Sequence, residues 1–580
     1  MMRVLRGALL TAAILALAAG SAYAQARGSI FGKVTDASGG VLPGVTVTVE
    51  GTGLQQPLVG VTQSSGAYQF PVVPIGTYTV TFELASFKKT TRPNVVIVSG
   101  FNAEINGVME VGSLSEEMTV TAAAPVVDTK KTTTGATFDK EILENIPTAR
   151  DPWQIINMTP GVQAGLNVGG SSSGQQVGLS IYGTSSNVQW NLEGGSITDL
   201  SSNSSPSYFN FDSFEQIQVV TGGGDVSVQS SGLSINLVTK SGSNVFKGTA
   251  VGTFENDAMQ GSNVDEALFN RGAGGFLSGS PIKKIYNVSA EYGGPIKRNR
   301  LWWWASADRQ DINTGVLNFF DVSKGGFCAD LAEAQRLGAL SGAITYDKLQ
   351  QVQDCLFNDK TVIRDLSWKF NYQLNASNKF QYLFQSDNKI RNSRGASSTT
   401  AIEAATRQYS DAPWKLPLPT HSITHTWIAT DKLVFNNQYT YVHGGFFLDF
   451  QDYDTCGDSR YNGSDSSADY TRAGDCLWNQ QQLTNRTTGY RERSLGSSYQ
   501  TVRHSTELKT DATYFLTNVL GGDHSLKFGL GYRKNPILSF SHYGGGARAW
   551  YQCAGNRSAN CGDGLPVAAG SATGLVPYRA

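Results

Sequence analysis

The chain has 580 residues and a formal net charge of −1, so no global electrostatic field directs it toward nucleic acid or an acidic partner. Charged residues make up only 16% of the sequence, against roughly 25% in soluble proteins, while glycine occurs 64 times and aromatic residues reach 10%. This composition favours β-structure with many turns, and the length allows several domains.

Residues 1–24 have the pattern of an export signal. Arg3 and Arg6 form a basic start, Ala8–Ala19 is an apolar run, and a small-x-small cleavage site follows. The alternative is a membrane anchor, but a spanning helix needs about 20 apolar residues and this run is shorter. We therefore predict cleavage between Ala24 and Gln25. Since no later run is long and apolar enough for a spanning helix, we expect a periplasmic, secreted or outer-membrane barrel protein.

Residues 25–112 predict a small β-sandwich. Short alternating runs such as Val45–Val49 are separated by Gly, Pro and Asp clusters at roughly 8–12-residue spacing. The phrases GKVTDASGGVLPGVTVTV and SGAYQFPVVPIGTYTVTF resemble the carboxypeptidase regulatory-like domain. That resemblance implies a non-catalytic appendage, and the segment contains no histidine from which a zinc-peptidase motif could be built.

Residues 113–131 predict a flexible linker that contains one short β-prone patch with an acidic start. The patch consists of Glu117, Met118, Thr119, Val120 and Thr121. It resembles the TonB box of energy-coupled outer-membrane receptors, a segment that can add as a strand to a partner's sheet edge. The alternative is an ordinary strand at the end of the sandwich. The position of the patch, immediately before the next unit, favours the box.

Residues 132–244 predict a small α+β unit that is polar and rich in glycine and serine. Asp139–Asn145 and Asp151–Met158 are expected helices, with Asp139 as the N-cap of the first. Phe214–Gly248 contains two β-period runs separated by a glycine cluster. Because this composition gives the unit little core of its own, we expect it to be held inside something larger.

Three ordered phrases in this unit resemble the plug domain of TonB-dependent receptors: IPTARDPWQIINMTPGV, LSIYGTSSNVQWNLEGGSITD and FEQIQVVTGGG…SGLSINLVTKSG. The family commonly has Asp-Gly-Val where this chain has Glu193-Gly194-Gly195, and we expect the extra methylene of Glu193 to be tolerated. A second departure, at Gln229–Gly232 where many members have Tyr-Gly, leaves that turn's conformation open. The resemblance makes Thr239–Asn244 the tether between plug and barrel. It implies these plug-motif residues: Pro160, Gly161, Gly183, Glu193, Gly194, Gly222, Gly232, Thr239 and Lys240.

Residues 245–580 predict the N-terminal part of an antiparallel transmembrane β-barrel. In Leu366–Asn375, LSWKFNYQLN, apolar and aromatic residues alternate with polar ones, which fits a lipid-facing surface and a polar lumen. Short turns alternate with long polar segments at 315–361, 389–420 and 443–502, the asymmetry of outer-membrane barrels. GGPIKRNRLWWWASADRQ further resembles the Oar-like subgroup of these receptors.

About nine strands are predicted, the first at Val245–Glu255. Plugged outer-membrane transporters have about 22. The sequence ends at Tyr578-Arg579-Ala580, without the terminal aromatic residue typical of barrels. We therefore expect the chain to be the first part of a longer protein or a truncated gene product.

All six cysteines fall after residue 320, in three local pairs within the long polar segments. No CxxC spacing occurs and no histidine lies within a few residues of a cysteine, which argues against a metal site. Reduced thiols are the other alternative, but export favours oxidation. We predict disulfides Cys328–Cys355, Cys456–Cys476 and Cys553–Cys561, each worth about 2–4 kcal/mol to its loop.

The leading functional hypothesis is an outer-membrane receptor and transporter that uses no cofactor. The resemblance implies a TonB-like periplasmic partner, membrane lipid around the barrel, and a small ligand such as an oligosaccharide, peptide or metal chelate. Four loop aromatics could stack on such a ligand, although loop packing explains each of them more simply. They are Trp414, Tyr453, Tyr461 and Trp478.

Two other classes of function are an adhesion protein and an enzyme. A surface or adhesion protein would use the barrel only to anchor its disulfide-pinned loops. An enzyme is not predicted, because Gly170–Gly174 (GSSSG) lacks the strand and helix of a nucleophile elbow. His504–Glu507 (HSTE) does not extend to HExxH, and His421 and His425 are expected to be wall residues.

Overall fold

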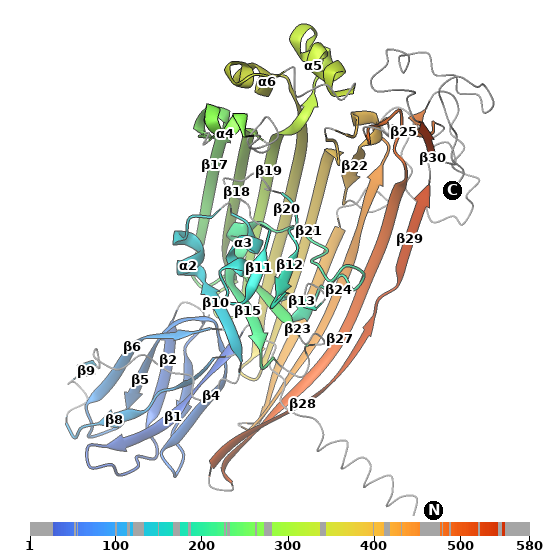
Figure 1. Cartoon of the computed structure of the whole chain (residues 1–580). Coiled ribbons are helices and arrows are strands. Elements are labelled where there is room, and N and C mark those ends of the chain that lie inside the picture. The colour runs from blue at the N-terminus through green and yellow to red at the C-terminus, as the bar shows by residue number, and fades with distance from the viewer. Residues whose placement is uncertain are drawn as a thin grey trace, which may run out of the picture.

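The structure, a computed structural model, is mainly β, as predicted. It describes residues 27–51, 54, 56–98, 101–112, 117–119, 133–148, 150–165, 174–183, 187–224, 228, 232–261, 264–271, 281–336, 344–397, 399–410, 418–430, 432–452, 476–477, 480–485, 489–519, 522–542 and 548–551. The described chain forms a sandwich, a compact α+β unit and a long curved sheet, which Figure 1 shows in blue, cyan to green, and green to red.

The N-terminal sandwich consists of two facing sheets. One contains β1 (Arg27–Asp36), β4 (Ala67–Pro74), β7 (Asn102–Glu104) and β8 (Gly107–Met109). The other runs in the order β3 (Leu58–Val61), β2 (Thr46–Gly51), β5 (Gly76–Glu83), β6 (Lys89–Ile97) and β9 (Glu117–Thr119). Alternate residues of β2 and β5, such as Val47 and Val80, are fully buried between the sheets. This is the period-2 burial that the alternating sequence predicted.

The α+β unit, here called the plug, is built on a five-stranded sheet in the order β10-β15-β16-β13-β14. Its elements are β10 (Thr134–Asp139), α2 (Lys140–Asn145), α3 (Pro152–Asn157), β11 (Val162–Ala164), β12 (Leu179–Ile181), β13 (Val188–Leu192), β14 (Gly195–Ser196), η1 (Phe211–Ser213), β15 (Phe214–Gly222) and β16 (Leu233–Thr239). Both helices begin as predicted: the Asp139 carboxylate accepts from the Ile142 amide and Asp151 from the Trp153 amide.

The plug has a larger apolar core than its composition suggested. Trp153 of α3 packs against Trp190 of β13 with ring centroids 5.7 Å apart, and both rings are buried. All residues of β13 and β16 are buried, because these central strands are covered on both faces. The core is thus larger than expected, and it is completed by Leu383 and Val442 of the wall, in keeping with a unit held inside something larger. The apolar residues are few, but they are concentrated on the central strands and on α3.

The third unit is an antiparallel sheet that we call the wall. Its segments are β17 (Lys247–Asn256), β18 (Ile282–Lys297), β19 (Leu301–Phe320), β20 (Leu356–Asn375), β21 (Asn378–Arg394), β22 (Thr406–Tyr409), β23 (Leu418–Thr430), β24 (Leu433–Asp449), β27 (Ser498–Val519), β28 (Gly522–Lys534) and β29 (Ile537–His542). β22 and β23 both lie between β21 and β24, and β28 and β29 both pair with β27. Within the described residues the wall thus has nine strand positions, as predicted.

Several wall strands are longer than the predicted ten or so residues, and β27 reaches 22. They extend into segments that were predicted as loops. The alternation on β20 is the predicted one: Leu366 and Phe370 are 43% and 37% exposed, whereas Lys369 on the opposite face is 1% exposed. Figure 1 shows the plug against the inner face of the curved wall, so the buried polar side is the lumen.

The loop between β19 and β20 is folded rather than extended. It contains η4 (Val322–Lys324), α5 (Gly326–Arg336), η6 (Tyr346–Lys348) and α6 (Leu349–Asp354), and a disulfide joins Cys328 to Cys355. Phe320, Leu331 and Val352 form a small core beneath these helices. In Figure 1, α5 and α6 lie at the end of the wall opposite the sandwich.

Three shorter helical elements and three short strands complete the described structure. They are η2 (Asp257–Met259), α4 (Glu266–Asn270), η7 (Ile402–Ala404), β25 (Gln482–Asn485), β26 (Arg491–Glu492) and β30 (Arg548–Tyr551). No helix among the described residues has the length and apolarity needed to cross a membrane.

Candidate functional site at the plug–wall interface

Glu193 occupies the turn between β13 and β14. Its φ is 53° and that of Gly194 is 84°, so both central residues of this two-residue hairpin are left-handed, as in a type I′ turn. Glycine adopts this conformation without cost, whereas glutamate does so with strain. The Asn236 side chain accepts a hydrogen bond from the Gly194 amide at 3.0 Å. The turn presents the Glu193 carboxylate at the joint between plug and wall.

The Glu193 carboxylate is the centre of a buried polar cluster. Oε1 accepts from the amide and hydroxyl of Thr239 and from Lys369 Nζ, each at 2.8 Å, and Oε2 accepts from Gln381 at 3.0 Å. Lys369 also donates to the Thr239 carbonyl at 2.9 Å. The Glu193 and Lys369 side chains are only 3% and 2% exposed. One carboxylate thus joins the plug turn, the end of β16 and two wall strands.

Two opposing effects act on the pKa of Glu193. Burial alone would raise it, because a carboxylate loses its hydration in the interior. The positive charge of Lys369 and the hydrogen bonds from Lys369 and Thr239 outweigh burial and lower the pKa below its ordinary value. Glu193 is therefore ionised at neutral pH and forms a true ion pair with the wall.

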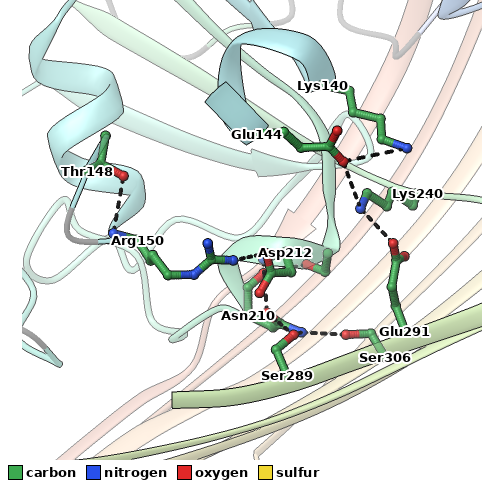
Figure 2. A network of polar contacts seen from close by, with 11 residues as sticks. Lys140, Glu144, Thr148, Arg150, Asn210, Asp212, Lys240, Ser289, Glu291 and Ser306 are labelled. Atoms are coloured by element: carbon green, nitrogen blue, oxygen red, sulfur yellow. Dashed lines mark hydrogen bonds and ion pairs between the residues drawn. The ribbon is translucent and has the colours of Figure 1, made fainter. Parts of the chain in front are cut away.

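A second ionic contact follows directly along the chain. Lys240 Nζ lies 2.7 Å from Glu291 Oε1 on β18, and the Trp304 indole donates to the other oxygen of Glu291 at 2.7 Å. Figure 2 shows Lys240 between Glu291 of the wall and Glu144 of the plug, which is 3.8 Å away. The exit from the plug sheet is therefore bound to the wall on both sides of the Thr239–Lys240 peptide.

The loop before β15 contacts the same wall strands. Asn210 donates to Ser289 and Ser306 at 3.1 and 2.6 Å, and Arg150 forms an ion pair with Asp212 within the plug (Figure 2).

Contacts at the far side of the plug are polar as well. Asp199 forms an ion pair with Arg503, and the Ser196 amide donates to Glu507 at 2.9 Å. By contrast, Leu383 and Val442 are the wall residues in the buried plug core. The interface is therefore held mainly by hydrogen bonds and ion pairs, whose partners water can replace.

The structure gathers only some of the predicted plug-motif residues at this interface. Glu193, Gly194, Thr239 and Lys240 lie together. Pro160, Gly161 and Gly183 lie instead around the β11–β12 hairpin, where the Gly161 carbonyl accepts from the Tyr182 amide at 3.1 Å. Gly222 ends β15, and Gly232 precedes β16, where an added Cβ would lie 2.3 Å from the Asn187 carbonyl. These glycines serve the plug's own turns.

Sequence reasoning missed the wall half of the site. Lys369 belongs to the polar face of the alternating run Leu366–Asn375, and nothing in the alternation distinguishes it from Asn371 or Ser367. Gln381 and Glu291 gave no signal either. A basic residue in the middle of a membrane strand is the one clue that could have marked Lys369, since such a residue needs a partner.

The TonB-box-like patch is partly described. Glu117–Thr119 form β9 and pair in parallel with Lys89–Thr91 of β6, which is the arrangement of the alternative, an ordinary strand at the end of the sandwich. Val120 and Thr121 lie outside the described residues. The structure thus shows where the patch is docked; pairing with a partner protein stays a prediction.

Other predicted residues fall largely outside the described chain. This applies to Ala24 and Gln25, to Cys456, Cys553 and Cys561, and to the loop aromatics Trp414, Tyr453, Tyr461 and Trp478. Cys476 is disulfide-bonded. His421 and His425 lie on β23 beside Tyr382 and Phe380, on the face away from the plug. Within the described residues, no group of three or more metal-ligating side chains is arranged to hold an ion.

A polar-lined wall filled by a separate α+β plug defines the class of plugged outer-membrane β-barrels. Comparison with known proteins makes this more specific. Residues 29–110 match the carboxypeptidase regulatory-like domain. Over 324 residues the chain is 28% identical to the TonB-dependent transporter Oar of Myxococcus xanthus, a match that covers 52% of this chain and 28% of that protein.

Solved structures with a similar arrangement include the siderophore receptor PirA of Acinetobacter baumannii, with a TM-score of 0.43 and 14% identity. The match covers 70% of this chain and 48% of PirA. The outer-membrane transporter YddB of Escherichia coli gives a TM-score of 0.42 at 12% identity, covering 70% of this chain and 54% of YddB. The chain thus matches about half the length of these proteins and a smaller part of Oar.

The resemblance to TonB-dependent receptors of the Oar-like subgroup, with an N-terminal carboxypeptidase regulatory-like domain, is confirmed by these findings. So is the predicted location in the outer membrane. The similarity to a transporter also agrees with the expectation that the protein is not an enzyme.

Proposed function

We propose that the protein is a receptor that binds a small ligand at its outer face and imports it with energy from an inner-membrane TonB complex. Residues 25–112 form the appended sandwich, 113–131 the segment offered to the TonB-like partner, 132–244 the plug, and 245–580 the first part of the barrel. The observation that supports this best is the polar plug–wall interface centred on Glu193 and Lys369.

The chemistry of that interface suits a plug that must move. If the interface were large and apolar, a shift of the plug would expose it to water at a free-energy cost of about 25 cal/mol per Å². A hydrogen bond contributes only about 0.5–1.5 kcal/mol net, because water replaces the lost partner. Ion pairs such as Lys240–Glu291 can be hydrated in the same way. A mechanical pull on the N-terminal side could therefore rearrange the plug at moderate cost.

A covalent lock between plug and wall tests this mechanism. A Cβ built on Gly195 would lie 3.1 Å from Thr440 Cβ on β24. The mean Cβ separation in a disulfide is about 3.8 Å, so the two strands need to move apart only slightly. The pair Gly195→Cys and Thr440→Cys should close a bond between plug and wall in the oxidising periplasm. We expect ligand accumulation to stop in the oxidised double variant and to return on mild reduction. Equal accumulation in both states would refute a moving plug.

The energy-coupling segment has its own test. The pairing of β9 with β6 uses only three residues of backbone, so the segment can exchange one sheet edge for another. Deleting residues 116–121 should abolish energy-dependent uptake and leave ligand binding at the cell surface intact.

A second candidate, a surface or adhesion protein, is favoured by one observation. The outer loop with α5 and α6 has its own small core and a disulfide, as a rigid binding module would. If uptake is unchanged after the 116–121 deletion while surface binding persists, the transporter proposal fails and this candidate replaces it.

A further inference from the structure

Three aspartates form a row across the luminal face of the wall. Asp308 on β19 lies opposite Asp365 on β20, and Asp365 lies opposite Asp387 on β21, each as a register pair of neighbouring strands. Side chains paired in this way have Cβ atoms about 4.5–5.5 Å apart. All three are buried, with exposed fractions of 9%, 5% and 1% in chain order. We call these three residues the acidic row.

The carboxyl groups of the acidic row lack donors. Both oxygens of Asp365, and Oδ1 of Asp308 and of Asp387, are buried with no hydrogen-bond partner among the described residues. Oδ1 of Asn287, on the next strand β18, is buried and unpartnered in the same way. Buried polar atoms are normally hydrogen-bonded, so orphaned acceptors on neighbouring side chains indicate a site that needs a positively charged or protonated group.

Asp365, at the centre of the row, has an acid on each side. The charged groups that act on it are Asp308 and Asp387, both of its own sign. Burial disfavours every one of these charges, and each charge disfavours the next. Three neighbouring ionised carboxylates are therefore strongly unfavourable here, whereas a proton on Asp365 removes both repulsions at once.

Asp308, at one end of the row, shares its nearest cation with another acid. Arg150 of the plug interacts electrostatically with Asp308, but it forms its ion pair with Asp212 of the plug. A cavity of about 30 Å³ adjoins Asp308, Arg150 and Asn287, and it has enough room for a water molecule. This cavity gives a proton a route to the row.

Asp387, at the other end, lies two residues before Lys389 on the same face of β21. The Lys389 ammonium group bonds instead to Gln175 and to the Tyr208 hydroxyl, at 2.9 and 3.1 Å. The other charged groups that act on this lysine are Asp359, Arg391 and Arg394. In the described part of the chain, neither end of the row is thus neutralised by an ion pair.

A metal ion would be another way to neutralise the row, but the geometry opposes it. Neighbouring strands lie about 4.8 Å apart, so the strands of Asp308 and Asp387, which flank that of Asp365, are about 10 Å apart. Ligand oxygens must lie within about 2.0–2.6 Å of one Mg²⁺ or Ca²⁺ ion. Within the described residues, no three ligating side chains converge in that way. A proton needs only two neighbouring carboxyl groups.

A loop of the plug covers the acidic row from end to end. At one end the Tyr208 amide donates to Oδ2 of Asp387 at 3.1 Å. At the other end Asn210 donates to Ser289 at 3.1 Å (Figure 2). Ser289 is the register partner of Asp308. The exclusion of water from the row therefore depends on loop 208–210 of the plug.

We propose that the acidic row is a proton-binding site that opens and closes with the plug. While loop 208–210 lies on the row, Asp365 holds a proton and donates it in a hydrogen bond to Asp308 or Asp387. When the plug moves and water enters, the hydrated carboxyl group loses that proton to water. The inference concerns the docking of the plug alone and does not depend on import of a ligand.

The docked plug therefore binds more protons than the released plug. By linkage, the state that binds more protons is favoured at low pH, so the plug is retained less firmly as the pH rises. Glu193 acts in the other direction, because its ion pair with Lys369 is lost in acid. Retention of the plug should be greatest between these two transitions.

Infrared spectroscopy tests for the proton directly, because the carbonyl stretch of a protonated carboxylic acid is separate from the bands of ionised carboxylates and of the backbone. The purified full chain in detergent should show this band at neutral pH. Asp365→Asn should remove most of it, since the amide has the shape of the protonated acid and donates in its place. Asp359→Asn is the matched control: Asp359 is buried on the same strand but pairs with Arg391 at 2.6 Å, so the band should stay.

The pH dependence tests the link to the plug. The midpoint temperature of plug release, measured by limited proteolysis, should fall by several degrees in the parent when the pH is raised from about 6 to about 8. In Asp365→Asn this fall should be at least halved, because the row has no proton to lose. Circular dichroism of each variant checks that the wall is intact.

Four results would overturn the proposal. The first is the absence of a protonated-acid band from the parent at neutral pH, which requires no variant. The second is an unchanged band in folded Asp365→Asn and Asp387→Asn chains. The third is loss of the band on calorimetrically detected binding of Ca²⁺ or Mg²⁺, which would make the row a metal site. The fourth is an equal pH dependence of plug release in the parent and in Asp365→Asn. Failure of the covalent lock to stop ligand accumulation would count against the proposed function alone.

Discussion

Among single residues, Glu193 offers the sharpest test of how the plug is held. Glu193→Gln removes the counter-ion of Lys369 and leaves a buried ammonium group unpaired, which costs about 3–5 kcal/mol. We expect the plug to be released from the wall at a lower temperature. Limited proteolysis at increasing temperature measures the midpoint of this release. Glu193→Asp is the control: aspartate keeps the charge and tolerates the left-handed turn better, so its loss should be much smaller.

The same residue predicts a pH dependence. Since the pKa of folded Glu193 is below its ordinary value of 4.5, its contribution to stability is fully present above that pH and is lost as pH falls through the lowered value. The difference in thermal midpoint between the parent and Glu193→Gln should therefore be constant near neutrality and shrink under acid. A difference independent of pH from 7 to 3 would contradict an ionised Glu193.

The plug residues of this site could be predicted from the sequence, whereas its wall residues could not. Glu193 and Thr239 stand in phrases whose resemblance to a plug could be recognised. Lys369 and Gln381 occupy alternate positions of their strands, as every other luminal residue does. Their role in binding Glu193 depends on which plug residue lies opposite them in the folded protein. That pairing is set by packing between segments more than a hundred residues apart, which no local pattern encodes.

Among the structural elements, the helical loop between β19 and β20 departs furthest from expectation. The sequence predicted a polar loop with a Cys328–Cys355 bond; the structure adds α5, α6 and a core of Phe320, Leu331 and Val352. Helices this short are marginal alone, so their stability comes from packing and from the cross-link rather than from propensity. Alternation likewise predicted the strands of the wall but not where they end. In β21, for example, the outer residues Asn388–Arg394 are polar on both faces except for Ile390.

Removing that disulfide should therefore have a local effect. The double variant Cys328→Ser and Cys355→Ser is expected to lose about 2–4 kcal/mol of loop stability. Without the cross-link, the unfolded loop has more conformational entropy to lose on folding. Protease should then cleave within 322–355 while the wall strands stay protected from hydrogen exchange. Loss of protection throughout β19 and β20 would mean that the loop core supports the wall itself.

For the molecule as a whole, the central question is whether plug and wall are separable bodies. If Thr239–Asn244 were only a flexible link between plug and wall, cutting it would free the plug. In the structure this segment is bound to the wall at both ends. Lys240 forms an ion pair with Glu291, and Asn244 accepts a hydrogen bond from the Trp302 indole at 2.8 Å. Cleavage alone leaves these contacts and the Glu193 cluster in place.

We therefore expect a chain cut at an engineered protease site between Ser241 and Ser243 to keep its plug, and the same cut in a Glu193→Gln background to release it. Size-exclusion chromatography in detergent measures the released fragment, and infrared spectroscopy the β-content of the remaining wall. The uncut Glu193→Gln chain is the control for release caused by the variant alone. Prompt release from the cut parent would show that the tether, rather than the ion pairs, retains the plug. Collapse of the wall on release would show that plug and wall are one folding unit, because Leu383 and Val442 of the wall complete the plug core.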